Sequence, residues 1–198
     1  YSKIEDNTDR IYSYYGPQDK DMDYYLKNDS YGGDIQLGSN IEVGSQIHKL
    51  TYGLDFSQFE SSRLRKTINN KTSAVENIKD QPDTDTTRLG IYLQDEFSSG
   101  KTDFILGLRY DDYNLDAKSD SIFENSSTVG TPLAADHSSN ALSPSLAATY
   151  NWSQELATYA KYSKGFRAPS YMEINSSRNP GYYTTLSNPD LKAETSDT

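Results

Sequence analysis

Six separate segments of the chain alternate apolar and polar residues with a period of two. In residues 102–115, Phe104, Leu106, Leu108 and Tyr110 share one parity, and the positions between them are mostly polar or glycine. Successive side chains of a β-strand point to opposite faces, so this spacing predicts a strand with one apolar face. The same pattern predicts strands over residues 31–41, 47–60, 88–98, 141–152 and 155–163. Because no segment shows a helical period, we predict an all-β chain.

The connections between these segments alternate strictly between short and long. Short turns are predicted at residues 42–46, 98–101 and 151–154. Long polar stretches cover residues 61–87, 116–140 and 164–192. Compact soluble domains seldom contain several loops above about 15 residues, whereas transmembrane β-barrels combine short periplasmic turns with long extracellular loops. We therefore predict an antiparallel barrel segment of about seven strands, and a soluble β-sandwich is the alternative.

Aromatic residues and one proline within the predicted strands bear on this prediction. Tyr110, Tyr150, Trp152 and Tyr162 lie at or near predicted strand ends, where an aromatic girdle would meet the lipid headgroups. Pro144 lies inside a predicted strand and cannot donate a ladder hydrogen bond, so it predicts a strand start or a bulge.

Composition excludes several other classes of protein. The 17 tyrosines argue against a disordered chain, since disordered segments are poor in aromatic residues. A net charge of −10 argues against a nucleic-acid partner. The chain has no cysteine, and it contains no sequence pattern of a serine hydrolase, P-loop or zinc peptidase. We therefore predict a protein that is not an enzyme, with no metal site and no intrinsic cofactor.

Two short segments resemble the paired FRAP and NPNL boxes of TonB-dependent receptors for haem and haemoglobin. The boxes are Phe166, Arg167, Ala168 and Pro169, followed by Asn188, Pro189, Asp190 and Leu191. Each lies where a predicted strand meets a loop: Pro169 turns the chain into the loop, and Asn188-Pro189 is a turn-initiating pair that brings it back. Residues 50–55 and 90–96 also resemble the middle of such barrels.

The resemblance implies that residues 1–198 are part of a barrel of about 22 strands closed by a plug domain. The plug and the C-terminal end of the barrel would lie outside this chain, and the plug would connect to the TonB complex. The implied location is the outer membrane of a Gram-negative bacterium, in contact with its lipid. The implied transported ligand is haem, free or taken from haemoglobin. Alternatives are a siderophore or other iron-source receptor, or an adhesive barrel that transports nothing.

Ligand-contacting residues are expected in the long loops. In the family, the loop between the boxes carries a histidine, but residues 170–187 of this chain contain none. Tyr171, Tyr182 and Tyr183 offer phenol groups instead, and tyrosine can ligate haem iron. Their other interpretation is packing of the loop against its neighbours.

The remaining candidates are two histidines and one arginine. His137 lies in the long stretch 116–140 and is a possible ligand, although a solvated loop histidine is the simpler interpretation. His48 follows a short turn and is interpreted as structural. Arg167 could pair with a carboxylate of the wall or with a haem propionate, because a guanidinium binds carboxylates well.

Overall fold

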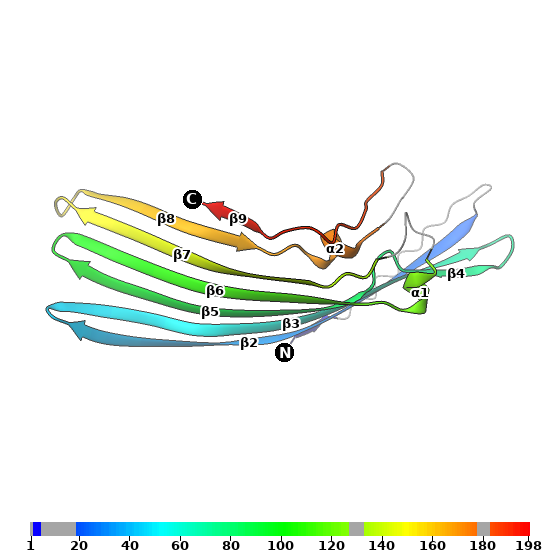
Figure 1. Cartoon of the computed structure of the whole chain (residues 1–198), viewed down its shortest axis with the longest axis horizontal. Coiled ribbons are helices and arrows are strands. Elements are labelled where there is room, and N and C mark those ends of the chain that lie inside the picture. The colour runs from blue at the N-terminus through cyan, green and yellow to red at the C-terminus, as the bar shows by residue number, and fades with distance from the viewer. Residues whose placement is uncertain (1, 5–18, 127–132, 178–182) are drawn as a thin grey trace.

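The computed structural model describes residues 2–4, 19–126, 133–177 and 183–198, which form one long antiparallel sheet (Figure 1). Its elements are β1 (Ser2–Ile4), β2 (Lys20–Val43), β3 (Gln46–Asn69), β4 (Val75–Ile78), β5 (Asp83–Ser99), β6 (Thr102–Lys118), α1 (Ser121–Glu124), β7 (His137–Asn151), β8 (Ala157–Arg167), α2 (Tyr171–Asn175) and β9 (Glu194–Asp197). The strands follow the order β1-β2-β3-β5-β6-β7-β8-β9, with β4 beside β3. The predicted all-β antiparallel fold is confirmed, and the two helices are single turns.

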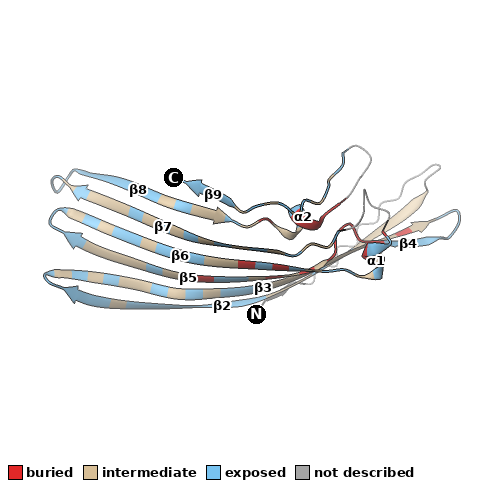
Figure 2. Ribbon diagram, in the orientation of Figure 1, coloured by how far each residue is buried: buried red, intermediate tan, exposed pale blue. Residues whose placement is uncertain are grey.

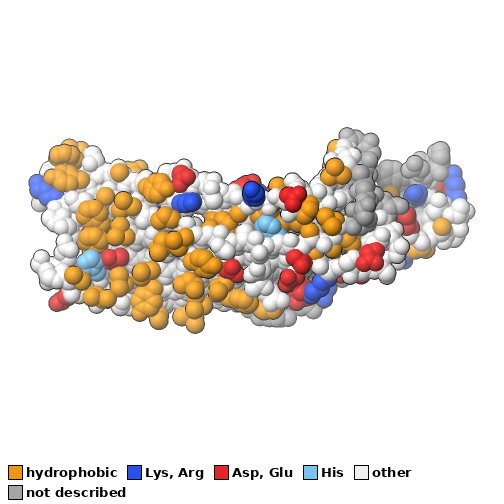
Figure 3. Space-filling model, viewed as in Figure 1, with side chains coloured by type: hydrophobic (Ala, Val, Ile, Leu, Met, Phe, Trp, Pro, Cys, Tyr) orange, Lys and Arg blue, Asp and Glu red, His pale blue; other side chains and the backbone are white. Residues whose placement is uncertain are grey.

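One face of the sheet carries the predicted apolar residues, and we call it the outer face. Ile35, Leu54, Ile91, Tyr110 and Leu142 lie opposite one another on consecutive strands of the meander. All five are exposed, and Ile91 keeps 51% of its surface. Figure 3 shows hydrophobic side chains gathered over the half of the sheet near the short turns. This apolar band therefore needs a partner other than the chain's own core.

The apolar band consists of the outward-facing apolar side chains of six strand segments: residues 33–43, 46–57, 88–99, 102–111, 141–151 and 157–163. Among the described residues, no helix is both long enough and apolar enough to cross a membrane.

The predicted short turns all lie at one end of the sheet (Figure 1). Val43 pairs with Gln46, so only two residues connect β2 to β3, and Gly44 has a φ of +65°. The turn between β5 and β6 is equally short, and Gly100 has a φ of +62°. Two-residue hairpins require this left-handed conformation, which glycine adopts without steric cost.

At the other end, the strands run further than the sequence pattern predicted. β3 continues to Asn69 and pairs with β2 as far as Lys20, so much of the predicted loop 61–87 is strand. β6 likewise extends to Lys118 into the predicted loop 116–140. These extensions carry few apolar residues, such as Leu64 and Ile68 on β3, so their alternation is weak. Their backbone ladder, which the sequence pattern does not reveal, holds them in the sheet.

A small core lies on the inner face beyond the apolar band. Ile78, Tyr113, Leu115, Phe123 and Ile174 are buried there. Figure 2 shows that buried residues gather around α1, α2 and the adjoining strands. The segment after β8 therefore folds over the inner face of the sheet instead of extending away from it.

Pro144 marks the place where two neighbouring strands separate. β7 pairs with β6 along most of its length, but it pairs with β8 only over Ser145–Asn151. The ladder stops immediately before Pro144, which has no N–H to donate. The strand interruption that the sequence predicted is therefore a break in one ladder, with no break in β7 itself.

His48 lies on the outer face close to the short turns, opposite Ile41. Its Nδ1 atom is 2.7 Å from Oδ2 of Asp95, and its ring stacks on Phe97 at 4.6 Å. These contacts join β3 to β5 within the apolar band.

Polar side chains cross the inner face behind the apolar band. Arg109 pairs with Asp55 at 2.9 Å and donates from Nε to Asp111 at 2.8 Å. The guanidinium lies above the ring of Tyr92, 6.0 Å from its centre. Tyr92 in turn lies against Gly53, where a Cβ atom would be 2.7 Å from the phenol oxygen and would overlap the Ile35 backbone oxygen. The close approach at position 53 therefore requires glycine.

We predict that Gly53→Ala destabilises the intact receptor by about 1–3 kcal/mol, because the backbone oxygen of Ile35 cannot move without breaking the β2–β3 ladder. Urea unfolding in detergent micelles measures the change. Gly33→Ala is the matched control, since no atom lies within 4 Å of a Cβ at Gly33. Equal stability of the two variants would contradict the prediction.

Candidate functional site

Arg167, in the first box at the end of β8, joins this strand to α2 and to β9. Its Nη1 and Nη2 atoms donate to the two carboxylate oxygens of Glu173 in α2, both at 3.0 Å. Its Nε and Nη2 atoms donate to Glu194 of β9 at 3.0 and 2.9 Å. One guanidinium therefore forms bidentate pairs with two carboxylates. Lysine could not form both pairs, because its ammonium group lacks the planar, forked arrangement of donors.

A capping box at the start of α2 holds the Glu173 carboxylate in position for this pairing. Ser170 is the N-cap of α2, and its hydroxyl accepts a hydrogen bond from the Glu173 N–H at 3.4 Å. The Glu173 carboxylate accepts the Ser170 N–H at 2.8 Å, which completes a capping box. This reciprocal pair fixes the carboxylate close to the end of β8.

The charges of this cluster stabilise one another. Hydrogen bonds from Arg167 lower the pKa of Glu173 to about 2, and those from Ser170 act in the same direction. Arg167 also lowers the pKa of Glu194, while the two carboxylates raise the pKa of Arg167. All three groups are solvent-exposed to a large degree, so the cluster orients segments more than it stabilises the whole fold.

The remaining box residues lie around this ion pair. Phe166 pairs with Thr195 of β9, and Pro169 is buried where the chain leaves β8. Ala168 lies between Arg167 and that proline and lines the cavity described below. The first box thus ends a strand, as predicted.

The second box forms the predicted turn. The Leu191 N–H donates to the backbone oxygen of Asn188 at 3.4 Å, and the Asp190 N–H donates to the Asn188 side chain at 3.3 Å. Pro189 and Asp190 are the central turn residues. The turn directs the chain back to β9, where Glu194 meets Arg167.

Two predicted ligand residues are packed on the inner face. The ring of Tyr171 lies 6.1 Å from that of Phe59 on β3, so α2 reaches across the sheet from β8. His137 was predicted in a loop, which is wrong, because it is the first residue of β7 and pairs with Leu115. Its ring lies 6.3 Å from Tyr113, and its buried Nε2 has no hydrogen-bond partner in the described part of the chain.

α2 also approaches the start of β7. The Asn175 side chain accepts the Ala135 N–H at 2.7 Å and donates to the Ala135 oxygen at 2.9 Å. α2 therefore contacts Arg167 at the end of β8, Phe59 on β3 and Ala135, two residues before His137. Tyr183 is exposed (42%), and Tyr182 lies outside the described residues.

A cavity of about 430 Å³ lies where β7 and β8 separate, and we call it the β7–β8 slot. Residues of four strands line it, including Arg88, Arg109, Tyr113, Lys164 and Phe166. It adjoins the first box and is large enough to hold part of a small ligand.

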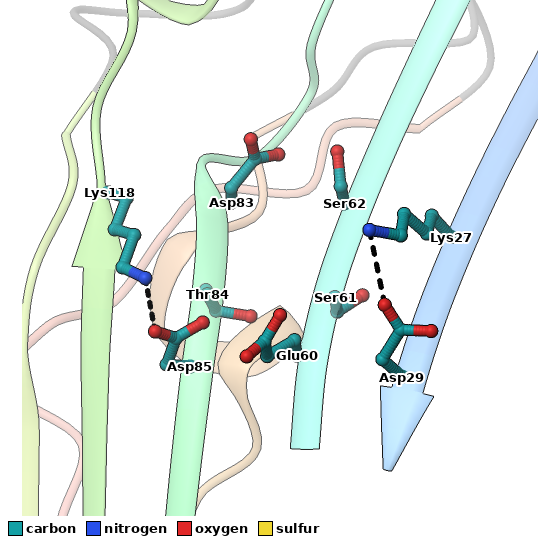
Figure 4. A pocket seen from close by; sticks show the side chains of 9 residues that line it. All are labelled: Lys27, Asp29, Glu60, Ser61, Ser62, Asp83, Thr84, Asp85 and Lys118. Carbon is teal, nitrogen blue, oxygen red and sulfur yellow. Dashed lines mark hydrogen bonds and ion pairs between the residues drawn. The ribbon is translucent and has the colours of Figure 1, made fainter. Parts of the chain in front are cut away.

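A second cavity lies on the polar extensions of β2, β3, β5 and β6 (Figure 4). Asp29, Glu60 and Asp85 lie directly opposite one another across three strands. Lys27 is 3.1 Å from Asp29, and Lys118 pairs with Asp85. The pair Lys118–Asp85 joins β6 to β5 beyond the apolar band, whereas Lys27 and Asp29 both belong to β2.

Sequence reasoning missed the partners of Arg167. The pattern Ser170-Tyr171-Met172-Glu173 is a readable capping-box signal, so Glu173 could have been found. The meeting of Glu194 with Arg167 depends on β8–β9 pairing and has no local signal.

The chain forms an open antiparallel sheet with an exposed apolar band. Two-residue turns lie at one end of the sheet and folded connections at the other. These features define the wall of a membrane β-barrel. The chain belongs to the family described as TonB dependent receptor-like, beta-barrel, whose model matches residues 1–198. Members of this family are outer-membrane proteins that act as receptors and transporters, so the chain is not part of an enzyme. No curated protein matches the chain.

Among solved structures, the chain is similar to the hemophore receptor HasR of Serratia marcescens, a double mutant in complex with its hemophore HasA and heme. The TM-score is 0.66 at 18% sequence identity, over 90% of this chain and 31% of that receptor. The chain thus spans about a third of the receptor it matches, and the likeness establishes the fold.

We predict that Arg167→Lys loosens both segments that Arg167 joins, because lysine cannot present two bidentate pairs. Amide hydrogen exchange of the intact receptor should become a few-fold faster in residues 170–177 and 194–197. Arg63→Lys is the control, since Arg63 lies over the ring of Tyr24 and away from the cluster. Unchanged exchange in Arg167→Lys would show that the ion pairs hold neither segment.

The lowered pKa values also predict a pH dependence. A carboxyl whose folded-state pKa is depressed contributes stability above its ordinary pKa, here 4.5, and loses that contribution as the pH falls toward the folded value. The α2 contact should therefore weaken between pH 4.5 and about 2. A ¹³C-carboxyl NMR titration with glutamate labelling, assigned by Glu173→Gln, measures this pKa. Arg167→Gln should return it toward 4.5, and an ordinary value in the unaltered protein would refute the assignment.

Proposed function

We propose that this chain forms part of the wall of an outer-membrane receptor that takes up haem with TonB-derived energy. The observation that carries the proposal is the pairing of Arg167, in the first box, with Glu173 and Glu194, which holds α2 and β9, the elements that follow the two boxes, at the end of β8. A barrel that binds a ligand on its loops needs such rigid supports, because binding groups must be held in place. The structure of the similar HasR receptor, in complex with heme, supports the choice of ligand.

In this proposal the apolar band contacts the lipid of a Gram-negative outer membrane. Exposed residues such as Ile35, Ile91 and Leu142 would be costly in water, whereas lipid accepts them without penalty. The strand extensions and folded connections then face the cell exterior, and the short turns face the periplasm. A plug domain outside residues 1–198 would couple the receptor to the TonB complex.

The proposed ligand contacts lie on the segments around α2. Tyr171, Tyr182, Tyr183 and His137 are the candidates for contact with the porphyrin or its iron. The buried Nε2 of His137 has no partner in the described chain, which suits a ligand atom. It lies beneath the α2 region, so its use would require α2 to move.

A receptor for a siderophore or another iron source is the second candidate. The observation that favours it is the absence of histidine from residues 170–187, between the two boxes. Siderophores carry their own iron ligands, so a siderophore receptor would need no axial histidine.

Titration of the intact receptor in detergent with haemin and with haemoglobin tests the proposal. We expect saturable binding of at least one of them, with a change in the haemin absorption band. Ferric siderophores serve as the comparison ligands. Binding of a siderophore alone would transfer the assignment to the second candidate. Binding of none, combined with attachment to host cells, would favour an adhesive barrel.

A further inference from the structure

The connections at the end of the sheet opposite the short turns contain two buried runs of residues. One run is residues 78–82, between β4 and β5, and the other is residues 174–177, at the end of α2 (Figure 2). Lys79 keeps only 6% of its surface and Asp80 only 8%, although both are charged. Charged residues are seldom buried unless they are paired. The partners of these two residues therefore explain why the first run is buried.

Lys79 contacts the residues on both sides of α1. Its Nζ atom donates to Oδ2 of Asp83 at 2.8 Å and also donates to Asp120. Asp120 is at the same time the N-cap of α1, and its Oδ1 atom accepts the Phe123 N–H at 2.8 Å. The Lys79 N–H donates to the hydroxyl of Ser126, just beyond α1, at 2.9 Å. The connection between β6 and β7 is thus held by one lysine of the connection between β4 and β5.

Asp80, the next residue in the chain, joins the same run to the segment after α2. Its backbone oxygen accepts the N–H of Ser177 at 3.0 Å, and Ser177 is only 5% exposed. The Asp80 carboxylate lies 3.7 Å from Arg65 on β3. Residues 78–82 therefore bind α1 on one side and the α2 segment on the other, and Arg65 anchors them to the sheet.

These contacts depend on one another because they converge on adjacent residues. A backbone movement that breaks the contacts of Lys79 also moves the Asp80 oxygen that binds Ser177. Polar groups that lose their partner while still buried cost free energy, since water does not replace the lost bond. Three connections that are far apart in the sequence should therefore order and open together, as one local unit of stability.

We infer that residues 78–82, 120–126 and 171–177 form one cooperative unit, in which Lys79 is a positioning residue for α2. The coupling runs from Lys79 through the Asp80 backbone to Ser177, and by linkage it acts equally in both directions. The inference rests on the proposed function in one respect, because it takes the segments around α2 as the carriers of the ligand contacts. It adds a control of these segments by a lysine that is too deeply buried to contact a ligand.

Amide hydrogen exchange of the intact receptor in detergent tests the coupling from Lys79 to α2. Lys79→Met removes the charge and keeps an unbranched side chain. The Asp83 and Asp120 side chains are 34% and 39% exposed, so water can replace the ammonium group and the barrel should still fold. We expect exchange to become several-fold faster in residues 121–126 and also in residues 171–177.

Lys27→Met is the matched control, since Lys27 also pairs with an aspartate but lies on β2, outside the unit. It should leave exchange in both segments unchanged. Heat-modifiable migration in gel electrophoresis checks that each barrel is folded, and exchange in the strand residues 88–98 should be the same in all variants. Faster exchange in residues 121–126 alone would overturn the inference. So would an equal effect of the control, or a general acceleration that includes the strand.

The reverse direction of the coupling is tested at Ser177. Ser177→Pro removes the N–H that binds Asp80, and Ser176 already has a φ of −83° and a ψ of 126°, the conformation that a residue before proline prefers. Ser177→Ala is the matched control, because it removes only the hydroxyl, which accepts the Ser187 N–H at 3.1 Å. We expect faster exchange in residues 121–126 for the proline variant alone. Equal exchange in the two variants would overturn the inference, even where Lys79→Met does not fold.

Haemin titration of the same variants connects the unit to the proposed function. Lys79→Met should bind haemin several-fold more weakly than Lys27→Met, because α2 is no longer held in one position. Equal affinity of the two variants would overturn the role of Lys79 in positioning the ligand contacts. If the unaltered receptor binds no haemin, the haem assignment falls, and the exchange measurements still decide whether the three connections are coupled.

Discussion

The register of the antiparallel ladder is the constraint on which the rest of this structure depends. Side chains alternate with a period of two, so a slip of one residue would move every apolar side chain from the outer to the inner face. The pairing of β2 with β3 is continuous over 24 residues of each strand, and it places Ile35 opposite Leu54. The two-residue turns at Gly44 and Gly100 fix this register, because they leave no slack between the paired ends.

Where the ladder stops, side-chain contacts take over its role. Pro144 ends the pairing of β7 with β8; from that level onward α2 is positioned by ion pairs and helix capping, and β9 by a short ladder with β8 together with an ion pair. Arg167 supplies four hydrogen bonds to two carboxylates that belong to separate segments. Such exposed contacts are individually weak, so the position of these segments depends on several contacts together.

The pattern of apolar residues predicted the strands inside the apolar band correctly and the polar extensions poorly. Leu106, Leu108 and Tyr110 repeat every second residue, and such a signal exists only where one face must be apolar. Arg63, Arg65 and Lys66 of β3 carry no such signal, since most residues of this extension are polar and are partly covered by other parts of the chain. His137 was assigned to a loop for the same reason, although it begins β7.

By itself, the sequence determined the strand period, the position of the short turns, the strand end at the first box and the turn at Asn188-Pro189. These features arise from residues close together in the chain, through backbone conformation and the alternation of side chains. Only the tertiary structure decided that Arg167 meets Glu194, that α2 crosses to Phe59, and that Arg88 and Lys164 line one cavity. The physical reason is that these contacts join different elements of the fold, and their geometry follows from ladder register and from the end of the β7–β8 ladder at Pro144.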